Sequence, residues 1–455
     1  MNYYQESAKK IPIREFDVII AGGGTAGVVA AIAAARQGVK TALIESKGYP
    51  GGIVVEGGTA LHSFYNLWKA FPEAEKRQVV KGIPQEIVDR LVKESGSTGH
   101  VEMLEGYDYD SVCTAIDTEI YKYVVFSMLK EANVNVFVNT LLTDAITEGN
   151  TIKGIIVESR SGREVFTAKS FVDCTGYGDL SAYANANFVE LNDHPVANSI
   201  GVGNVSMEKY YEFLKKHDAV REYSEGKRSG EEGKIIRLEA NMQKLPDEFI
   251  KKAKEIGMST VTTSVHDNYF MFIKLNYKMP VSPTDRDEIN KAELELRKRQ
   301  LKAIELLREF IPGCEKAFIA RTSPSLCIRR GRTIVCDYDI TRSDVLNGKH
   351  FKDDIMAYGF HDYAPRLQIK DGGTYGIPYR ALCVKGINNL LAAGMLITSD
   401  WDAHMSTRNT VCCMGQGQAA GTAAALSAQH NQKIRELQYT FLRETLENDG
   451  VYIED

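Results

Sequence analysis

The amino end of the chain alternates between apolar and mixed segments in the manner of an α/β fold. Residues 16–21 (FDVIIA) form a nearly continuous apolar run, which predicts a parallel strand buried on both faces. Residues 25–37 are rich in alanine and predict a helix that ends at Gly38. Residues 39–45 predict a second strand, so these three elements form a βαβ unit with short links.

A second group of strands is predicted after a helix over residues 114–132. The turn SRSGRE between two of them predicts a hairpin. These strands cover residues 134–139, the neighbourhood of Asp144, residues 152–159 and residues 169–174.

The middle of the chain differs from both ends. Highly charged helical segments around residues 207–216 and 291–310 are mixed with strand-like runs such as YFMFIKL. Towards the carboxyl end, residues 388–394 predict a returning buried strand and residues 410–429 a long helix of small residues. A chain of 455 residues exceeds the usual size of one core. We therefore expect a discontinuous nucleotide-binding domain over 1–184 and 381–455, with an α+β substrate domain over 185–380 inserted between the two parts.

Composition and charge narrow the function classes. The chain is 44% hydrophobic and 25% charged, as in ordinary globular proteins, and its net charge of −5 disfavours nucleic acid as a partner. No apolar run approaches the roughly 20 residues that span a bilayer. The first residues lack the pattern of a secretory signal, so we expect a cytoplasmic protein without a membrane partner. The eight cysteines lack metal-site spacing, and packing explains adjacent Cys412 and Cys413 better than a redox pair does.

The first predicted strand and helix are joined by a phosphate-binding pattern. Gly22, Gly24 and Gly27 form GxGxxG, in which the glycines permit a tight turn, close approach of a pyrophosphate and close helix packing. The amides at Thr25 and Ala26 begin the helix, where they would face phosphate groups. Glu45 ends the second strand, where a carboxylate would bind the adenosine ribose, and Ser46 follows it. A glycine-rich turn without a ligand is the alternative, and the motif alone does not separate FAD from NAD.

Three further segments resemble the FAD-dependent oxidoreductase family of the glutathione-reductase-like superfamily. They are ESKGYPGGIVVEGG after the second strand, FVDCTGYGDLSA over residues 171–182, and NNLLAAGMLITSDWDAHMSTR with GQAAGTAAAL near the carboxyl end. A fourth segment, SLCIRRGRTIVCDYDIT, resembles an arginine-containing stretch of the family. Between about residues 185 and 320 the resemblance is weak, so it does not identify the substrate.

The resemblance implies FAD as the cofactor and adds residues to its site. In the family, the helix near Gly417 and Gln418 points its amides at the flavin, where a helix amino terminus would stabilise negative charge. The chain has Met395 where the family commonly has arginine, which removes any contact assigned to that arginine. The other positions implied to lie near the cofactor are Gly51, Gly52, Leu142, Asp173, Thr175, Gly176, Asp179 and Gly394.

Several residues are candidates for catalysis beside the flavin. The resemblance implies that His404 and Arg408 lie near it, and His404 is a candidate acid or base because imidazole titrates near neutral pH. A helix-cap or surface histidine is the alternative for His404. Arg408, Arg329 and Arg332 are candidate clamps for a carboxylate or a polyol, with a salt bridge at a domain interface as the alternative. Further candidates are His361 with Asp362, Tyr379, and the possible pocket residues His62, Tyr65 and Trp68.

Together these patterns predict an FAD-dependent oxidoreductase that transfers a hydride between flavin N5 and a small polar molecule, such as a polyol, a sugar-like compound or a hydroxy or keto acid. An NAD-linked dehydrogenase and a flavin-bound binding or RNA-modification protein are the alternatives. No second GxGxxG follows a strand, so a separate NADH domain is not expected. We expect no metal. The electron acceptor and the oligomeric state stay open.

Overall fold

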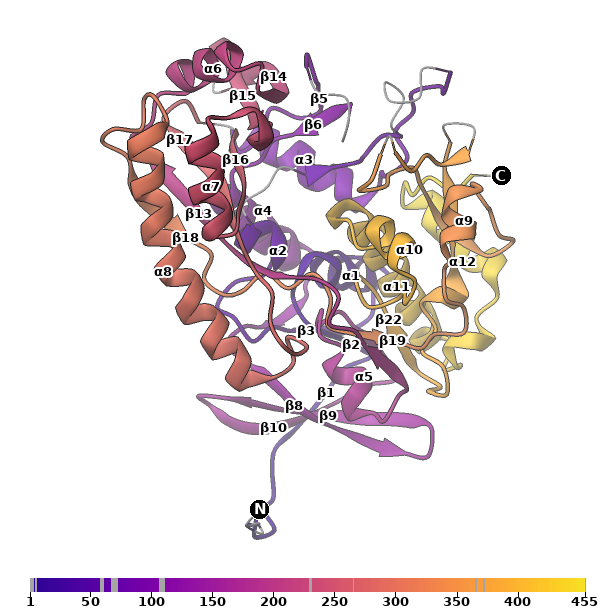
Figure 1. Cartoon of the computed structure of the whole chain (residues 1–455). Coiled ribbons are helices and arrows are strands. Elements are labelled where there is room, and N and C mark those ends of the chain that lie inside the picture. Colours follow the sequence, from indigo (N-terminus) through magenta and orange to yellow (C-terminus); the bar gives the residue numbers. More distant parts are fainter. Residues whose placement is uncertain are drawn as a thin grey trace.

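The structure is a computed structural model, and two hydrophobic clusters organise it. One cluster surrounds a parallel sheet, and the other lies beside an antiparallel sheet (Figure 1). The structure describes residue 4 and residues 6–57, 61–66, 73–105, 111–228, 231–264, 266–364, 366–370 and 373–454.

A five-stranded parallel sheet forms the centre of the first cluster. All residues of its first two strands in chain order, Val18–Ala21 and Thr41–Ile44, are buried, as expected from their apolar sequences. The carboxyl-terminal strand pairs in parallel with the strand over Ser170–Asp173, which confirms the predicted returning strand. In spatial order the strands are β22 (Leu390–Ala392), β11 (Ser170–Asp173), β2 (Val18–Ala21), β3 (Thr41–Ile44) and β7 (Asn135–Phe137).

Two helices of small residues pack closely beside this sheet. They are α1 (Thr25–Arg36) and α11 (Thr410–Gln429), which are indigo and yellow neighbours in Figure 1. A Cβ on Gly417 would lie 2.2 Å from the carbonyl oxygen of Ala26, and one on Gly421 would lie 2.1 Å from that of Ala30. Glycine at these positions therefore lets the two helix backbones approach each other, and the amino and carboxyl ends of the chain share one core.

Further elements surround the parallel sheet. The turn SRSGRE forms a hairpin, in which Ser159 of β9 (Thr151–Ser159) pairs with Gly162 of β10 (Gly162–Thr167). The predicted partner strand over residues 169–174 is instead β11 of the parallel sheet. A four-stranded sheet contains β1 (Ile13–Glu15), β10 (Gly162–Thr167), β9 (Thr151–Ser159) and β8 (Leu141–Glu148). A three-stranded sheet contains β4 (Leu61–His62), β6 (Val112–Thr114) and β5 (Val101–Glu102). The helices are α2 (Ile53–Gly57), α3 (Ile83–Lys93), α4 (Thr118–Glu131), α5 (Asp179–Tyr183) and α12 (Tyr439–Asn448).

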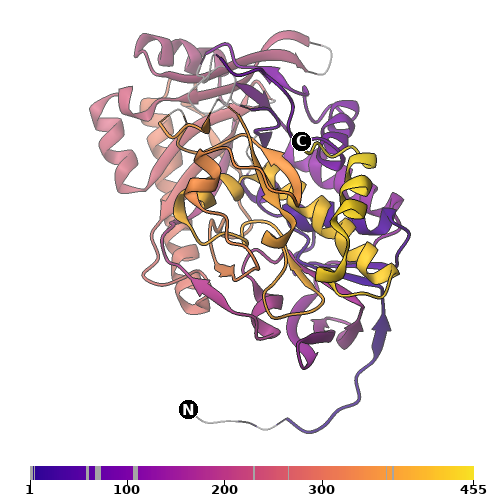
Figure 2. The ribbon, with the colours of Figure 1, turned by 90° about the vertical axis from the view of Figure 1, so that its right-hand side faces the viewer.

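The second cluster contains a six-stranded antiparallel sheet covered by charged, amphipathic helices, as the middle of the sequence predicts. Figure 1 shows these helices on the outer side of this part of the molecule, and Figure 2 shows the same part on the side away from α12. In spatial order the strands are β14 (Val220–Arg228), β15 (Glu231–Ala240), β16 (Met258–Ser264), β17 (Tyr269–Tyr277), β13 (Val196–Gly203) and β18 (Phe318–Thr322). The helices are α6 (Met207–Lys216), α7 (Asp247–Glu255) and α8 (Arg286–Phe310), with a 3₁₀ turn, η1 (Met242–Lys244).

The chain returns to the first cluster earlier than residue 380. Ile334, Ile355 and Tyr379 are all buried in that cluster, so this stretch packs with the parallel sheet rather than with the six-stranded sheet. The elements of the return are β12 (Phe188–Glu190) paired with β19 (Arg332–Ile334), β20 (Asp354–Tyr358) paired with β21 (Tyr375–Pro378), α9 (Arg342–Leu346), α10 (Trp401–Thr407), η3 (Tyr379–Ala381) and η4 (Ile434–Glu436). Among the described residues, no helix is long and apolar enough to cross a membrane.

Candidate active site

A cavity of about 800 Å³ lies between the two sheets. Its volume falls in the range of roughly 300–1,000 Å³ that is common for small-molecule sites. We call two parts of its lining the glycine-turn wall and the strand wall. The glycine-turn wall consists of Gly22, Gly24, Thr25 and Ala26, between β2 and α1. The strand wall consists of Arg221, Glu222, Arg237, Glu239, Thr260 and Thr262, from β14, β15 and β16.

Each glycine of the GxGxxG motif has a distinct steric role. Gly22 has a φ of 91°, and a Cβ there would lie 2.5 Å from the carbonyl oxygen of Cys174. A Cβ on Gly27 would lie 1.8 Å from the carbonyl oxygen of Gly22, so this glycine lets α1 begin close to β2. A Cβ on Gly24 would meet no atom closer than 4.0 Å. The absence of a side chain at Gly24 therefore leaves space in the cavity itself.

The amino terminus of α1 is part of the same wall. Gly24 is its N-cap, and no side chain there hydrogen-bonds the first turn. Thr25 and Ala26, the first helical residues, line the cavity. Backbone N–H groups at such a terminus lack partners within the helix and attract anions, so this wall suits a diphosphate.

Glu45 lies beside the glycine turn at the end of β3. Its side chain is buried, and its Oε2 accepts a hydrogen bond of 2.8 Å from the backbone N–H of Gly23. Its Oε1 accepts hydrogen bonds from the backbone N–H of Lys47 at 2.8 Å and from the hydroxyl of Ser46 at 3.2 Å. Glu45, Ser46 and Lys47 all line the cavity. The carboxylate is thus fixed at the position where a ribose would follow the diphosphate.

Most of the other residues expected near the cofactor also line this cavity. Gly51 does not: a Cβ there would lie 2.7 Å from Val55, and its backbone N–H donates to the carbonyl of Gly23, so it shapes the loop. Asp173 does not line it either and accepts hydrogen bonds from Thr175 and Ser181. Those that line it are Gly52, Leu142, Thr175, Gly176, Asp179 and Gly394, and Met395, which replaces the family's arginine, lines it too.

Gly417 and Gln418 lie away from the cavity. Gly417 faces α1, where it permits the close helix contact described above. The Oε1 of Gln418 accepts a hydrogen bond of 2.9 Å from the backbone N–H of Ile83. The part of α11 that lines the cavity is its first turn, with Thr410 and Cys413, preceded by Asn409. The end of this helix that faces the cavity is therefore at Asn409 and Thr410, about two turns before Gly417.

The donor and acceptor groups in this cavity fit an adenine dinucleotide, because a side-chain-free turn, a helix amino terminus and a buried carboxylate lie next to one another. A family model described as FAD dependent oxidoreductase matches residues 17–446. The chain belongs to this family. The family is that of the FAD-dependent oxidoreductases, and FAD is its cofactor.

Matches to individual curated proteins are short. The chain is 33% identical over 94 residues to a 3-oxosteroid 1-dehydrogenase of Mycolicibacterium smegmatis, a match that covers 21% of this chain and 16% of that protein. It is 52% identical over 48 residues to a dihydrolipoyl dehydrogenase of Bacillus subtilis, covering 10% of this chain and 9% of that protein. The matches thus span less than a fifth of either relative's length.

A similar solved structure is that of a geranylgeranyl bacteriochlorophyll reductase-like protein from Thermoplasma acidophilum. The TM-score is 0.47 and the sequence identity 13%, and the alignment covers 96% of this chain and 83% of that one. A second is p-nitrophenol 4-monooxygenase from Pseudomonas putida, with a TM-score of 0.46, 11% identity and coverage of 96% and 84%.

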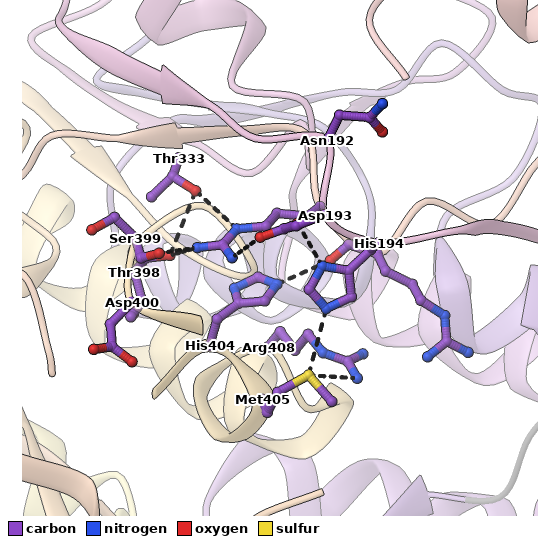
Figure 3. A network of polar contacts seen from close by, with 12 residues as sticks. Asn192, Asp193, His194, Thr333, Thr398, Ser399, Asp400, His404, Met405 and Arg408 are labelled. Atoms are coloured by element: carbon purple, nitrogen blue, oxygen red, sulfur yellow. Dashed lines mark hydrogen bonds and ion pairs between the residues drawn. The ribbon is translucent and has the colours of Figure 1, made fainter. Parts of the chain in front are cut away.

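A buried polar network beside the cavity contains two of the catalytic candidates, His404 and Arg408 (Figure 3). The guanidinium of Arg330, whose side chain is fully buried, pairs with Asp193 at 2.7 Å and donates to the carbonyl of Thr398 at 2.8 Å. Asp193 also contacts Nδ1 of His194 at 2.7 Å. This network ties the segment before β13 to the loop before α10.

His404 lies within this network and does not line the cavity. It is fully buried, and its Nε2 donates a hydrogen bond of 3.1 Å to the carbonyl of Arg329. Burial, together with the positive charges of Arg330 and Arg408, holds the pKa of His404 well below its ordinary value. His404 therefore lies behind Arg329 and not at the cavity surface, and its imidazole holds the Arg329 backbone. Its role as an acid or base stays a prediction.

His361 and Arg332 also lie outside the cavity lining. The Nε2 of His361 contacts the carbonyl oxygen of Asp402 at 2.9 Å, and burial lowers its pKa. Arg332 donates to the carboxylate of Asp179 at 2.9 Å and to the carbonyl of Tyr177 at 3.0 Å. Arg332 thus supports Asp179, which does line the cavity, from behind.

Arg329 and Arg408 both line the cavity, as does Asp362. Arg408 forms an ion pair with Asp362, and both side chains are mostly buried. Desolvation makes such a pair sensitive to the loss of either partner. Arg329, Arg408 and Asp362 are therefore the predicted charged candidates that the structure brings to the cavity.

The remaining predicted residues divide between the cavity and the core. His62 lines the cavity, whereas the hydroxyl of Tyr379 donates to the carbonyl of Ile434 in the core. Tyr65 does not line the cavity and packs edge-on against His100. Trp68 lies outside the described residues. All eight cysteines are buried, and no group of metal-binding side chains occurs in the described part of the chain.

Sequence reasoning missed the strand wall. Arg237 lies between Glu222 and Glu239, with its Nε 2.8 Å from Oε2 of Glu222 and its Nη2 2.9 Å from Oε2 of Glu239. Burial and the nearby carboxylate of Glu222 raise the pKa of Glu239. Burial opposes ionisation of Glu222 too, but Arg237 lowers its pKa overall. The available signal was the alternation in IIRLEA, where charged residues at every second position predict a polar face on a buried strand.

Proposed function

We propose that FAD lies along the glycine-turn wall with its diphosphate at the amino terminus of α1, and that a small polar organic substrate lies towards the strand wall. When bound, FAD supplies the redox chemistry by accepting or giving a hydride at N5. The observation that carries this proposal is that one cavity joins the glycine turn to a set of buried polar side chains.

The residues proposed to hold FAD come from both ends of the chain. The carboxylate of Glu45 accepts hydrogen bonds from the ribose hydroxyls, and the diphosphate occupies the open space beside Gly24. Asn409 and Thr410, at the start of α11, approach the flavin, in place of Gly417 and Gln418. The other proposed contacts are Gly22, Thr25, Ala26, Ser46, Gly52, Leu142, Thr175, Gly176, Asp179 and Gly394.

We also propose a domain arrangement of the glutathione-reductase type, in which residues 1–184 and 381–455 form the FAD-binding domain around an inserted substrate domain. The packing of Ile334 and Tyr379 with the first cluster supports moving the second boundary from residue 380 to about residue 330. Arg329 and Arg408 are proposed to orient the substrate beside the flavin, because both line the cavity. His404 and Arg332 are positioning residues in this proposal.

The first test is spectroscopic. The purified protein should be yellow, with a flavin absorption spectrum, and a substrate should bleach it under anaerobic conditions. Small polyols, sugar acids and hydroxy acids form the screening set. A protein that retains no flavin and binds nicotinamide dinucleotide tightly would instead support the NAD-linked dehydrogenase.

A matched pair of variants tests where the diphosphate lies. In Gly24→Val the side chain should enter the cavity without clashing with the fold, so the protein should fold and lose FAD. Gly48→Ala is the control in a nearby loop, because its Cβ would make only ordinary contact with Asn139 at 3.4 Å, and it should keep FAD. Flavin content per folded protein, measured by absorbance and circular dichroism, decides between them. Full FAD retention in Gly24→Val would contradict the proposed site.

A further inference from the structure

The strand wall contains a nearly complete hydrogen-bond network around Arg237. The residue is only 5% exposed, and its guanidinium binds both Glu222 and Glu239. Oε1 of Glu239 accepts from the hydroxyl of Thr260 at 2.6 Å and from Arg221 at 3.4 Å. Both oxygens of Glu239 are therefore satisfied within the protein.

Two buried polar atoms of this wall lack partners. Oε1 of Glu222 and Oγ1 of Thr262 make no hydrogen bond, although the two residues are only 2% and 1% exposed and both line the cavity. The sheet register pairs Glu222 with Glu239 and Glu239 with Thr262. Residues paired in this way point to the same face of a sheet, so the two atoms flank Glu239 on the cavity side. Buried polar groups normally have partners, and a ligand in the cavity would supply them.

We infer that Glu222 and Thr262 recognise the hydroxyl or amino groups of the substrate, so that the substrate class is a polyol or an amino alcohol rather than a carboxylic acid. This inference rests on the proposed function. An ionised carboxylate oxygen accepts hydrogen bonds and donates none, so the ligand atom at Glu222 must be a donor. The hydroxyl of Thr262 can donate a hydrogen bond to a second polar group of the substrate or accept one from it.

The charges of the wall favour the same class. The positive charge of Arg237 faces two carboxylates, so it has no excess to offer an anionic substrate. A substrate carboxylate near Oε1 of Glu222 would meet a like charge at close range. Lys274 on β17 also lines the cavity and would attract an anion, which makes a carboxylate probe the decisive comparison.

The test uses the FAD-loaded protein and three probes with one carbon skeleton: glucitol, glucamine and gluconate. Dissociation constants come from perturbation of the flavin absorption spectrum, with the thermal shift of the holoprotein as a second readout. Glucitol or glucamine should bind at least about tenfold more tightly than gluconate, the size expected for a buried hydrogen bond to a charged group. Tightest binding by gluconate, or no response to any of the three, would overturn the inference.

Two variants test the residues themselves. Glu222→Gln can present its amide N–H₂ to the cavity, so donor probes should lose about tenfold or more in affinity and the preference over gluconate should shrink. Thr262→Val removes an unpaired hydroxyl, so it should weaken binding while the melting temperature without probe stays the same or rises. This second variant keeps the inference testable if Glu222→Gln does not fold.

The control is Glu148→Gln, at an exposed end of β8, which should bind the probes as the unmodified protein does. Unchanged affinities in both Glu222→Gln and Thr262→Val would show the inference to be incorrect. A protein without flavin would refute the proposed function, whereas a flavoprotein that passes the spectroscopic test but shows no effect of these variants would refute the inference alone.

Discussion

The glycine-turn wall and the strand wall belong to one cavity but are built by opposite means. The glycine-turn wall comes from one short segment, and its recognition groups are backbone amides exposed by the absence of side chains. The strand wall comes from separate strands, and its recognition groups are charged side chains that the sheet buries. Added side-chain atoms should therefore disrupt the glycine-turn wall, whereas removal of a charged side chain should destabilise the strand wall.

The largest effect is expected from removing the central charge of the strand wall. Arg237→Met leaves Glu222 and Glu239 buried together without a cation, and we expect the free energy of unfolding to fall by about 3–5 kcal/mol. Without the arginine, burial raises the pKa of both carboxyl groups in the folded state, so the folded protein binds protons more tightly than the unfolded chain. Stability should then fall as pH rises, and the loss should be larger at pH 8 than at pH 5.5.

Urea unfolding at the two pH values measures this effect. Arg286→Met is the control, because that side chain is 85% exposed and its neighbouring carboxylate remains in water. It should change stability by less than about 0.5 kcal/mol. An Arg237→Met protein as stable as the control would show that the strand wall does not depend on charge pairing.

An added methyl group should damage the glycine-turn wall somewhat less. In Gly27→Ala the new Cβ would lie 1.8 Å from the Gly22 carbonyl oxygen, so α1 must move away from β2. We expect a loss of about 1–3 kcal/mol, the usual cost of overpacking, together with weaker FAD binding. Chemical unfolding and flavin content measure the two effects. Unchanged values for both would contradict the steric role assigned to Gly27.

Replacing each of the two glutamates of the strand wall by glutamine should reduce the free energy of unfolding by different amounts. The pKa of Glu222 is lowered, so its ionised form contributes stability that is present above the unfolded pKa and lost as pH falls through the folded one. The pKa of Glu239 is raised, so its ionisation opposes folding. At pH 7, Glu222→Gln should therefore cost about 1–3 kcal/mol and Glu239→Gln less.

The difference between these two variants should shrink below about pH 4.3, the ordinary pKa of a glutamate, as the unfolded chain takes up a proton at Glu222 and the folded unmodified protein does so at still lower pH. Unfolding midpoints across this pH range provide the measurement. Equal losses at pH 7 would remove the asymmetry inferred for the pair.

The smallest effect is expected at His404, outside both walls. His404→Gln retains a side-chain donor for the Arg329 carbonyl, so the cost should be about 1 kcal/mol. The lowered pKa of His404 means that the unfolded chain binds its proton more readily, so the unmodified protein loses stability as pH falls below about 6.5. The variant should lack this loss of stability, and its turnover should depend on pH in the same way as that of the unmodified protein. Loss of one side of the pH–rate profile in the variant would instead support His404 as an acid or base.

The sequence by itself determined the parts of the molecule that depend on local order. The apolar run before Gly22, the glycine spacing and the acid at Glu45 predicted β2, α1, β3 and the residues that line the turn. The small residues over 410–429 predicted α11 with its observed ends. These features can be predicted from sequence because a tight turn and a buried helix each restrict the residue types that occur a few positions apart.

Only the tertiary structure decided which distant side chains meet. His404 and Arg408 are four positions apart, yet His404 is buried against the Arg329 backbone whereas Arg408 lines the cavity. Gly417 serves helix packing because α11 runs against α1, which no property of its own segment reveals. The strand wall needs β14, β15 and β16 in register before Arg237 can lie between two glutamates. Burial and charge pairing are set by neighbours across the fold, so local sequence does not contain them.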